Sequence, residues 1–322
     1  MARANPSSPV TDLERAILDC RQRDYNLEGI PMYLVLEDLA SDPARRSAHG
    51  GRLGRLVADY LGRLVAERDQ ASLLDVATAL EVLAAYHFDP EDGEAPVTSA
   101  TTLGKLAAGP LVRTINFHNT AKAQSEEVER RLLAAGERFG AVDEKDLDGL
   151  LSGRAWDDRK PPLIPVFYEG YRNNYDVALP LLERAGLRGW FFIPTSFIDT
   201  AVPEQYAFAR AHHIGLTDED RAGDRCAMTW DELRDAAARG HVVACHTATH
   251  CAIVDVGTPE DVQRELIDSR RRLEQELGRE VRILAWLSGA PYGENERVDT
   301  AVRDEGYRLV FSNAKIQRIQ SA

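Results

Sequence analysis

The sequence contains few cysteines for its 322 residues. Cys20, Cys226, Cys245 and Cys251 are too few and too scattered to build a disulfide framework. A small secreted fold held together by disulfides is therefore excluded, and the cysteine usage fits a reducing compartment. An apolar content of 44% can fill a large core, so disorder is not expected.

Basic residues are also outnumbered by acidic ones. The chain has 39 lysine and arginine residues against 52 aspartate and glutamate residues, which gives a net charge of -13. Proteins that bind nucleic acid need a basic face to displace the counterions of the phosphates. We therefore expect no nucleic-acid partner, and a small or neutral molecule as the ligand.

Long apolar runs are absent as well. No stretch approaches the roughly 18 apolar residues of a membrane-spanning helix. The first residues, MARANPSSPVTDLERAILD, lack the apolar core of a signal peptide. We expect a cytoplasmic protein without a membrane partner, and a homo-oligomer is left open.

The spacing of apolar residues changes near Gly109-Pro110. Apolar residues at helical spacing, such as Leu53, Leu56, Val57 and Tyr60, predict a helical N-terminal domain over residues 1–106. Residues 107–322 alternate short apolar runs with amphipathic helices, which is typical of an α/β fold with a buried parallel sheet. The predicted strands are residues 112–117, 163–167, 190–193, 242–245, 283–286 and 308–311.

The strongest local pattern is CHTATHC, residues 245–251, directly after a predicted strand. Active sites of such folds lie at the carboxyl ends of the strands. If the chain turns helical here, His246 and His250 share one face, where two imidazoles can hold one metal ion. Histidines at this spacing also occur on plain helix surfaces, but the place after a buried strand favours a metal site. We leave Cys245 and Cys251 out of the predicted metal set, because Cys245 ends an apolar strand.

Longer segments resemble the polysaccharide deacetylase superfamily, the NodB-type proteins of carbohydrate esterase family 4. MTWDELRDAAARGHVVACHTATH is similar to the family's second motif, whose two histidines bind zinc or a similar ion. PPLIPVFYEGYRNNYDVALPLLERAGLRGWFFIP is similar to the first motif, and LIDSRRRLEQELGREVRILAWLSGAPYGENERV to the segment that ends in the third. INFHN, residues 115–119, is similar to the family's early strand. The matches cover residues 112–312 in the family's order.

This resemblance implies a distorted (β/α) barrel with fewer than eight strands, preceded here by the helical domain. It also implies that a metal ion activates the water in a deacylation reaction. Position by position, it places Glu169, His246 and His250 around a divalent ion, with zinc as the expected metal. The backbone N–H of Tyr292 takes the oxyanion role. A dication polarises an amide carbonyl and lowers the pKa of a bound water, and a nearby carboxylate takes the proton.

The sequence departs from the family pattern at the proton-transfer positions. Tyr168 stands where the family has the aspartate general base, and a phenol with a pKa of about 10 is a poor base at neutral pH. Glu169 is the remaining carboxylate, and no histidine follows His250 to act as the acid. The alternative proton carriers are His118, His212 and His213. Each of these histidines also has a purely structural interpretation, and Tyr168 can equally pack over the site.

Three functions are compatible with these residues. The first is a metal-dependent, deacetylase-like hydrolase of a non-peptide C–N bond in a small N-acyl or carbohydrate-derived substrate. The second is a metal-independent cyclic imide or ureide hydrolase, because the run Tyr168-Glu169-Gly170 resembles the first motif of the allantoinase-like branch of the superfamily. The third is a non-catalytic relative whose barrel binds a ligand or a partner.

Overall fold

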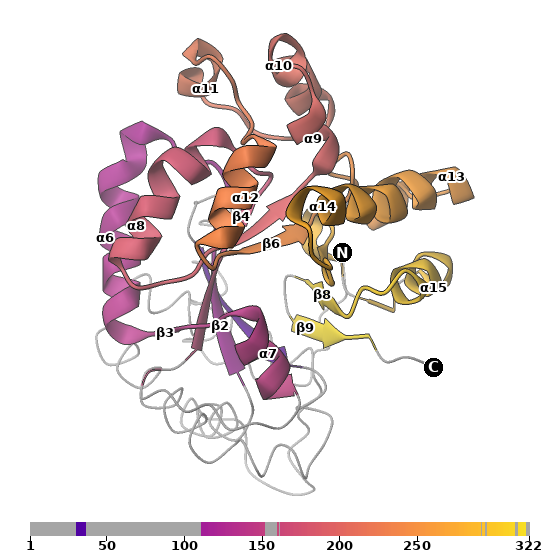
Figure 1. Cartoon of the computed structure of the whole chain (residues 1–322), viewed down its shortest axis with the longest axis horizontal. Helices are drawn as coiled ribbons and strands as arrows, with labels where there is room; N and C mark the ends of the chain where they lie inside the picture. The colour runs from indigo at the N-terminus through magenta and orange to yellow at the C-terminus, as the bar shows by residue number, and fades with distance from the viewer. Residues whose placement is uncertain are drawn as a thin grey trace, which may run out of the picture.

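The computed structural model describes residues 30–36, 111–151, 160, 162–290, 292–293, 295–312 and 315–319. A single curled sheet organises these residues (Figure 1). Its strands follow the order β2-β1-β9-β8-β7-β6-β5-β4-β3, and an additional pairing of β2 with β4 closes the sheet into a barrel. The strands are β1 (Ile30–Leu36), β2 (Leu111–Phe117), β3 (Gly140–Ala141), β4 (Pro162–Tyr168), β5 (Trp190–Ile193), β6 (Val242–Cys245), β7 (Ile283–Ala285), β8 (Leu309–Phe311) and β9 (Lys315–Arg318).

The strands predicted from the apolar runs are confirmed as β2 and β4 to β8, and these six run parallel to one another. Strands β4 and β5 read PLIPVFY and WFFI, with all but the last residue of β4 buried. Such uninterrupted apolar runs are what a parallel sheet needs, because both of its faces are covered. On one face of the sheet, Phe167 stacks between Phe117 and Phe191, with ring centroids 4.9 Å and 5.1 Å apart. Each fully buried phenylalanine contributes roughly 1.5 to 3 kcal/mol.

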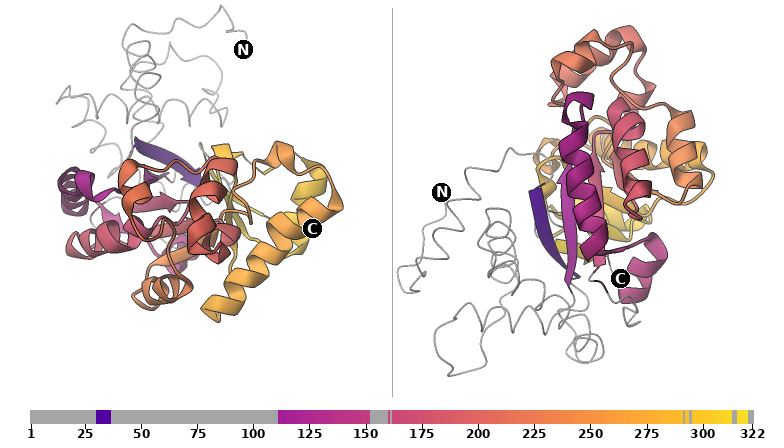
Figure 2. Two further views of the ribbon diagram at one scale, coloured as in Figure 1. Left: turned by 90° about the horizontal axis from the view of Figure 1, so that it is seen from above. Right: turned by 90° about the vertical axis from the view of Figure 1, so that its left-hand side faces the viewer.

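The prediction of an entirely parallel sheet is wrong. Strands β1 and β9 run parallel to each other, but β1 is antiparallel to β2 and β9 is antiparallel to β8. Figure 2 shows β1, in indigo, alongside β2. The two strands form a seam that joins the first and last parallel strands, and the fold is the predicted distorted (β/α) barrel with this mixed seam. The expectation of fewer than eight strands is wrong, because the sheet has nine strands among the described residues.

Strand β1 lies within residues 1–106, where we expected helices and no strand. Its sequence, IPMYLVL, includes Ile30, Tyr33 and Val35, which are residue types that favour strands. The rest of residues 1–106 lies outside the described part of the chain, so the helical domain and the boundary at residue 106 stay predictions.

Helices connect the parallel strands and cover the outside of the sheet (Figure 1). Neighbouring helices α6 and α8 pack together, as do α12 and α14. The helices are α6 (Ser125–Arg138), α7 (Glu144–Leu151), α8 (Leu179–Arg184), α9 (Thr195–Asp199), α10 (Val202–Ala211), α11 (Asp218–Ala222), α12 (Trp230–Ala238), α13 (Pro259–Val262), α14 (Ser269–Leu277) and α15 (Glu296–Asp304). Two π-helical turns, η2 (Asn174–Ala178) and η4 (Gln263–Asp268), lead into α8 and α14, and short 3-10 turns are η1 (Lys122–Gln124), η3 (Ile253–Asp255) and η5 (Leu287–Gly289). Among the described residues, no helix has the length and apolar character needed to cross a bilayer.

Between β5 and α12, the chain forms an insertion of three helices, α9, α10 and α11, at one end of the barrel (Figure 1). Its first helix contacts the loop that follows β6. The backbone N–H groups of Thr195 and Ser196 donate to the carbonyl oxygens of Thr247 (3.3 Å) and Ala248 (2.9 Å). The insertion is thereby fixed beside the loop that carries the two histidines of the CHTATHC pattern.

Candidate metal centre

The predicted site residues follow the carboxyl ends of three parallel strands. His118 comes directly after β2, Tyr168 ends β4 with Glu169 next to it, and His246 comes directly after β6. Parallel pairing of β2 with β4 aligns Phe117 with Phe167, so the residues after them leave the sheet at the same level. Glu169 and His246 therefore lie at the same end of the barrel, as predicted.

Three imidazoles converge there on one carboxylate. Glu169 Oε1 lies 3.8 Å from His118 Nε2, 4.0 Å from His246 Nε2 and 3.3 Å from His250 Nε2. Glu169, His246 and His250 are buried, and each offers one ligand atom that lies within 4.8 Å of the other two. The side chain of His118 is 53% exposed, so the cluster reaches solvent on that side.

The Nδ1 atoms of His246 and His250 form hydrogen bonds with backbone carbonyls. His246 Nδ1 is 2.8 Å from Ala285 O, and His250 Nδ1 is 2.8 Å from His212 O. A carbonyl oxygen can only accept, so Nδ1 carries the proton in each ring. A neutral ring in this tautomer turns the lone pair of Nε2 toward Glu169, which is the arrangement found in metal-bound histidines.

The donor set fits a metal ion. Glu169 Oε2 and His250 Nε2 are buried without a hydrogen-bond partner, although unpaired buried polar atoms are costly. Two imidazole nitrogens and a carboxylate face one another within 4.8 Å, and a cation between them would satisfy all three. Two nitrogens and one oxygen are the ligand types of catalytic zinc sites, which keep a further position open.

The loop reaches this geometry without forming a helix. His246 and His250 would share one face if the chain turned helical there, but residues 247–249 form a turn, and Thr247 (φ 65°) and His250 (φ 61°) are left-handed. Glu169 has φ 67° as well. Such backbone costs roughly 1 to 3 kcal/mol per non-glycine residue and concentrates at functional sites. Gly170, also left-handed at φ 68°, seats the Glu169 turn against β5, since a Cβ there would meet Ile193 Cδ1 at 3.0 Å.

Burial and neighbouring charge set the protonation states of the cluster. Burial, with help from His250, lowers the pKa of His246 to about 3, so this ring is neutral at physiological pH. Burial acts to raise the pKa of the Glu169 carboxyl, but the surrounding imidazoles, His118 foremost, outweigh it and hold this pKa below its usual value. The site therefore contains an ionised carboxylate and at least one neutral imidazole, as a metal site requires.

Tyr168 packs over the cluster. Its ring stacks on His118 with centroids 5.4 Å apart, and it lies 5.2 Å from the ring of His246. Burial, followed by the charge of Glu169, raises the pKa of the Tyr168 phenol above its usual value. The phenol therefore stays protonated at neutral pH.

Other predicted site residues lie in different environments. The Tyr292 N–H, expected to serve an oxyanion, donates to Gln317 Oε1 (2.8 Å), and Gln317 Nε2 donates back to Tyr292 O (2.9 Å). His212 contributes its backbone carbonyl to His250, while its ring packs on Phe208. Pro291, next to Tyr292 in the segment that resembles the third motif, was expected at the same end of the barrel and lies outside the described residues.

Sequence reasoning missed one buried acid beside the site. Glu265 of η4 is fully buried and contacts the loop between His246 and His250. A signal for it was present, because Glu265 falls between Val262 and Leu266 on the apolar face of its helix. A carboxylate on such a face needs a specific partner.

Comparison with known proteins agrees with this arrangement. The family model described as polysaccharide deacetylase matches residues 157–310, which include Glu169, His246 and His250. The chain carries a polysaccharide deacetylase domain. His118 precedes the matched segment and joins its site through the pairing of β2 with β4. The superfamily predicted from the motifs is therefore confirmed.

Individual relatives of the deacetylase domain are distant. "Putative polysaccharide deacetylase YxkH" of Bacillus subtilis (strain 168) is 23% identical over 156 residues, 47% of this chain and 46% of YxkH, so the chain spans less than half of that relative. The Streptococcus pyogenes deacetylase PplD in complex with acetate is similar with a TM-score of 0.48 and 15% identity, over 64% of this chain and 89% of PplD. IcaB from Ammonifex degensii is similar with a TM-score of 0.43 and 16% identity, over 64% of this chain and 89% of IcaB.

Proposed function

We propose that this protein is a metal-dependent hydrolase of a non-peptide C–N bond, with the deacylating chemistry of the polysaccharide deacetylase family. The observation that carries the proposal is the buried group of Glu169, His246 and His250, whose lone pairs face one another. A small N-acyl or carbohydrate-derived compound is the substrate class. The matched family supports this class, because its members are carbon–nitrogen hydrolases that act on carbohydrate.

Glu169, His246 and His250 would hold the ion, and zinc suits two imidazoles and a carboxylate. A bound divalent ion supplies Lewis acidity, which polarises the acyl carbonyl and makes water a stronger nucleophile at neutral pH. The carbonyl contacts at Nδ1 of both histidines keep their rings in place, so the protein need not reorganise them during the reaction.

Proton transfer falls to His118 in this proposal. Hydrolysis adds the oxygen of water to the acyl carbon, breaks the C–N bond and delivers a proton to the leaving nitrogen. The His118 imidazole is half exposed and its Nε2 lies 3.8 Å from Glu169 Oε1, so it can exchange protons with both solvent and the site. Tyr168, held protonated by burial, shields one side of the cluster from water.

The metal-independent alternative rests on the same 3.8 Å contact. Without an ion, Glu169 and His118 form an acid–base pair of the kind that a cyclic imide or ureide hydrolase needs. The two functions differ in the fate of the unpartnered atoms Glu169 Oε2 and His250 Nε2, which a bound ion would satisfy. A cytoplasmic location and the oligomeric state stay predictions from the sequence.

Elemental analysis of the wild type and of His246→Ala, purified without chelator, tests the proposal. We expect close to one equivalent of a transition metal in the wild type, and loss of most of the metal and nearly all turnover on N-acetyl substrates in the variant. His213→Asn is a matched control, since His213 is an exposed histidine and asparagine tolerates its φ of 59°. Less than about a tenth of an equivalent in the wild type, with turnover unaffected by added zinc, cobalt or manganese, would favour the metal-independent function.

A further inference from the structure

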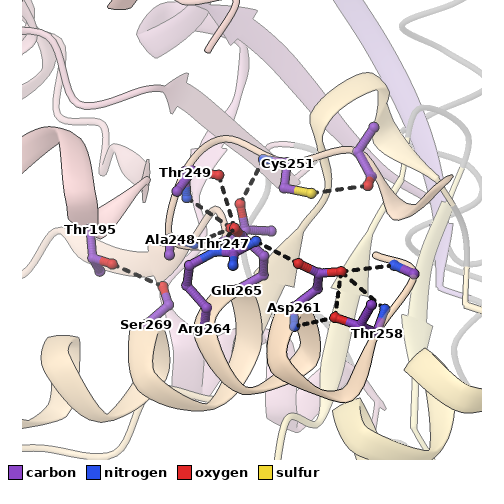
Figure 3. A network of polar contacts seen from close by, with 12 residues as sticks. Thr195, Thr247, Ala248, Thr249, Cys251, Thr258, Asp261, Arg264, Glu265 and Ser269 are labelled. Carbon is purple, nitrogen blue, oxygen red and sulfur yellow. Dashed lines mark hydrogen bonds and ion pairs between the residues drawn. The ribbon is translucent and has the colours of Figure 1, made fainter. Parts of the chain in front are cut away.

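The buried carboxylate of Glu265 binds the loop that carries His246 and His250. Glu265 Oε2 accepts hydrogen bonds from the backbone N–H groups of Ala248 (3.1 Å) and Thr249 (2.9 Å), and Oε1 accepts from the Thr249 hydroxyl (2.9 Å). Figure 3 shows these contacts, with the loop above the helix that carries Glu265. Both amides lie between the two histidines in the sequence.

The charge of Glu265 is balanced locally. Arg264 Nε donates to Glu265 Oε1 (2.8 Å), while the guanidinium also reaches Asp261 Oδ1 (2.8 Å) near the start of the same helix (Figure 3). Arg264 is half exposed and Glu265 has no exposed surface. A buried carboxylate with four donors is tolerated, but it is rarely better for stability than an apolar side chain of similar volume.

The helix is distorted where Glu265 sits. The residues from α13 to α14 form one helix that is interrupted by the π-helical turn η4, and Glu265 belongs to that turn. Turns of this kind are uncommon inside α-helices and are frequent at functional sites. The distortion and the buried charge are two separate costs, and both occur at the contact with the histidine loop.

The loop itself needs support from outside. Thr247 and His250 are both left-handed, and the Cys251 N–H donates to the Thr247 hydroxyl within the loop (2.8 Å). The loop receives this support from two sides. Glu265 accepts from the N–H groups of Ala248 and Thr249, and the N–H groups of Thr195 and Ser196 donate to the carbonyl oxygens of Thr247 and Ala248. Strained backbone persists only where surrounding contacts determine it.

We propose that Glu265 is a positioning residue for the metal centre. Its carboxylate fixes Ala248 and Thr249, and thereby sets the separation of the His246 and His250 Nε2 atoms that bind the ion. This inference rests on the proposed metal-dependent function. It assigns Glu265 no contact with the ion or with substrate.

Glu265→Gln is the decisive variant, because it keeps the size of the side chain and removes the charge. The amide of glutamine offers one acceptor oxygen and an NH2 group that faces the donors of Thr249 or Arg264. Asp261→Asn is the matched control, since Asp261 caps α13 from the same helix and its bonds go to Gly257, Thr258 and Arg264 rather than to the loop. Thr249→Val, which deletes one of the three loop bonds, is a second and milder test.

The measurements are zinc affinity by competition with a chromophoric chelator, and hydrogen–deuterium exchange of the metal-free loop peptide. We expect Glu265→Gln to weaken zinc binding by about tenfold to a hundredfold and to speed exchange at residues 246–251. Asp261→Asn should change neither by more than about twofold, even if both variants lose similar thermal stability. Thr249→Val should fall between them.

Equal zinc affinities in the wild type and Glu265→Gln, or equal losses in Glu265→Gln and Asp261→Asn, would overturn the positioning role while leaving the metal function intact. Unchanged exchange of the loop peptide in Glu265→Gln would also overturn it. Failure of the proposed function has a different signature, because the wild type itself would then bind no zinc. That result would refute both proposals.

Discussion

Asp220 on α11 ties the insertion to the two loops that carry the site. Its carboxylate accepts hydrogen bonds from Asn119 Nδ2 (2.6 Å), Asn173 Nδ2 (3.3 Å), and the backbone N–H and hydroxyl of Thr217 (2.7 Å each). Asn119 follows His118, and Asn173 lies just beyond the Glu169 turn. Asp220 is only 7% exposed, so water cannot replace these partners.

The change Asp220→Asn keeps the shape of the side chain and removes half of its acceptors. The new NH2 group faces donors on at least one side, so about two of the four bonds are lost, and one buried amide is left unpaired. Hydrogen bonds to charged groups are worth roughly 1.5 to 3 kcal/mol each, and Thr217 can recover part of the loss because it is partly exposed. We therefore expect the free energy of unfolding to fall by about 2 to 4 kcal/mol, and the midpoint of thermal unfolding by roughly 5 to 15 °C.

Urea unfolding followed by circular dichroism measures this loss, with an unchanged denaturant slope as the check on two-state behaviour. Asp218→Asn is the control, because Asp218 lies on the same helix with its side chain 96% exposed and pairs with Arg221 on the surface. Exposed pairs of this kind contribute little. If Asp220→Asn and Asp218→Asn have the same unfolding free energy, the buried network does not hold the insertion and the reasoning fails.

Three further predictions concern the site and the barrel. His118→Asn should lower kcat by about a hundredfold or more with unchanged metal content, because it removes the proposed proton carrier and leaves the ligands; a kcat near that of the wild type would contradict this role. Zinc at about a hundred times its dissociation constant should stabilise the wild type by about 2.7 kcal/mol in calorimetry, and His250→Ala should abolish the shift; an equal shift in both proteins would exclude His250 as a ligand. Deleting residues 1–106 removes β1 and exposes the edges of β2 and β9, so the product should aggregate, whereas deletion of residues 1–29 keeps β1 and is the control. A long deletion that is as soluble and stable as the short one would show that β1 is dispensable.

The parallel strands were predictable because burial on both faces leaves a strong trace in the sequence. WFFI in β5 and VVAC in β6 are apolar runs of four residues, which is a typical length for a buried strand and too short for a buried helix. The seam strands β1 and β9 have weaker sequence patterns. β9 reads KIQR, with polar residues that include the buried Gln317, and β1 lies in a region dominated by helical spacing. Their place in the sheet depends on long-range pairing, which local sequence does not record.

The sequence predicted which residues form the candidate site, but not the backbone conformation that brings them together. The order of the motifs identified Glu169, His246 and His250, because ligand types after buried strands are a local property of the sequence. The left-handed conformations of Thr247 and His250 have no such signature, since glycine is the usual residue there. Histidines four residues apart suggested a helix, whereas the structure brings them together through a strained turn. Part of the support of that turn comes from Glu265, whose burial depends on packing.

The position of Tyr168 decides which residues are free to move protons. Sequence comparison put the phenol where a base should stand, and its burial now raises its pKa further from neutrality, so the aromatic ring serves as packing. Glu169 cannot both hold an ion through its carboxylate and accept a proton efficiently, because the ion stabilises the charged form. His118 is the remaining titratable side chain in contact with the carboxylate among the described residues, and it is the one open to solvent. With a tyrosine at the base position, we therefore propose proton transfer through His118, which stacks on Tyr168 and lies outside the matched deacetylase segment.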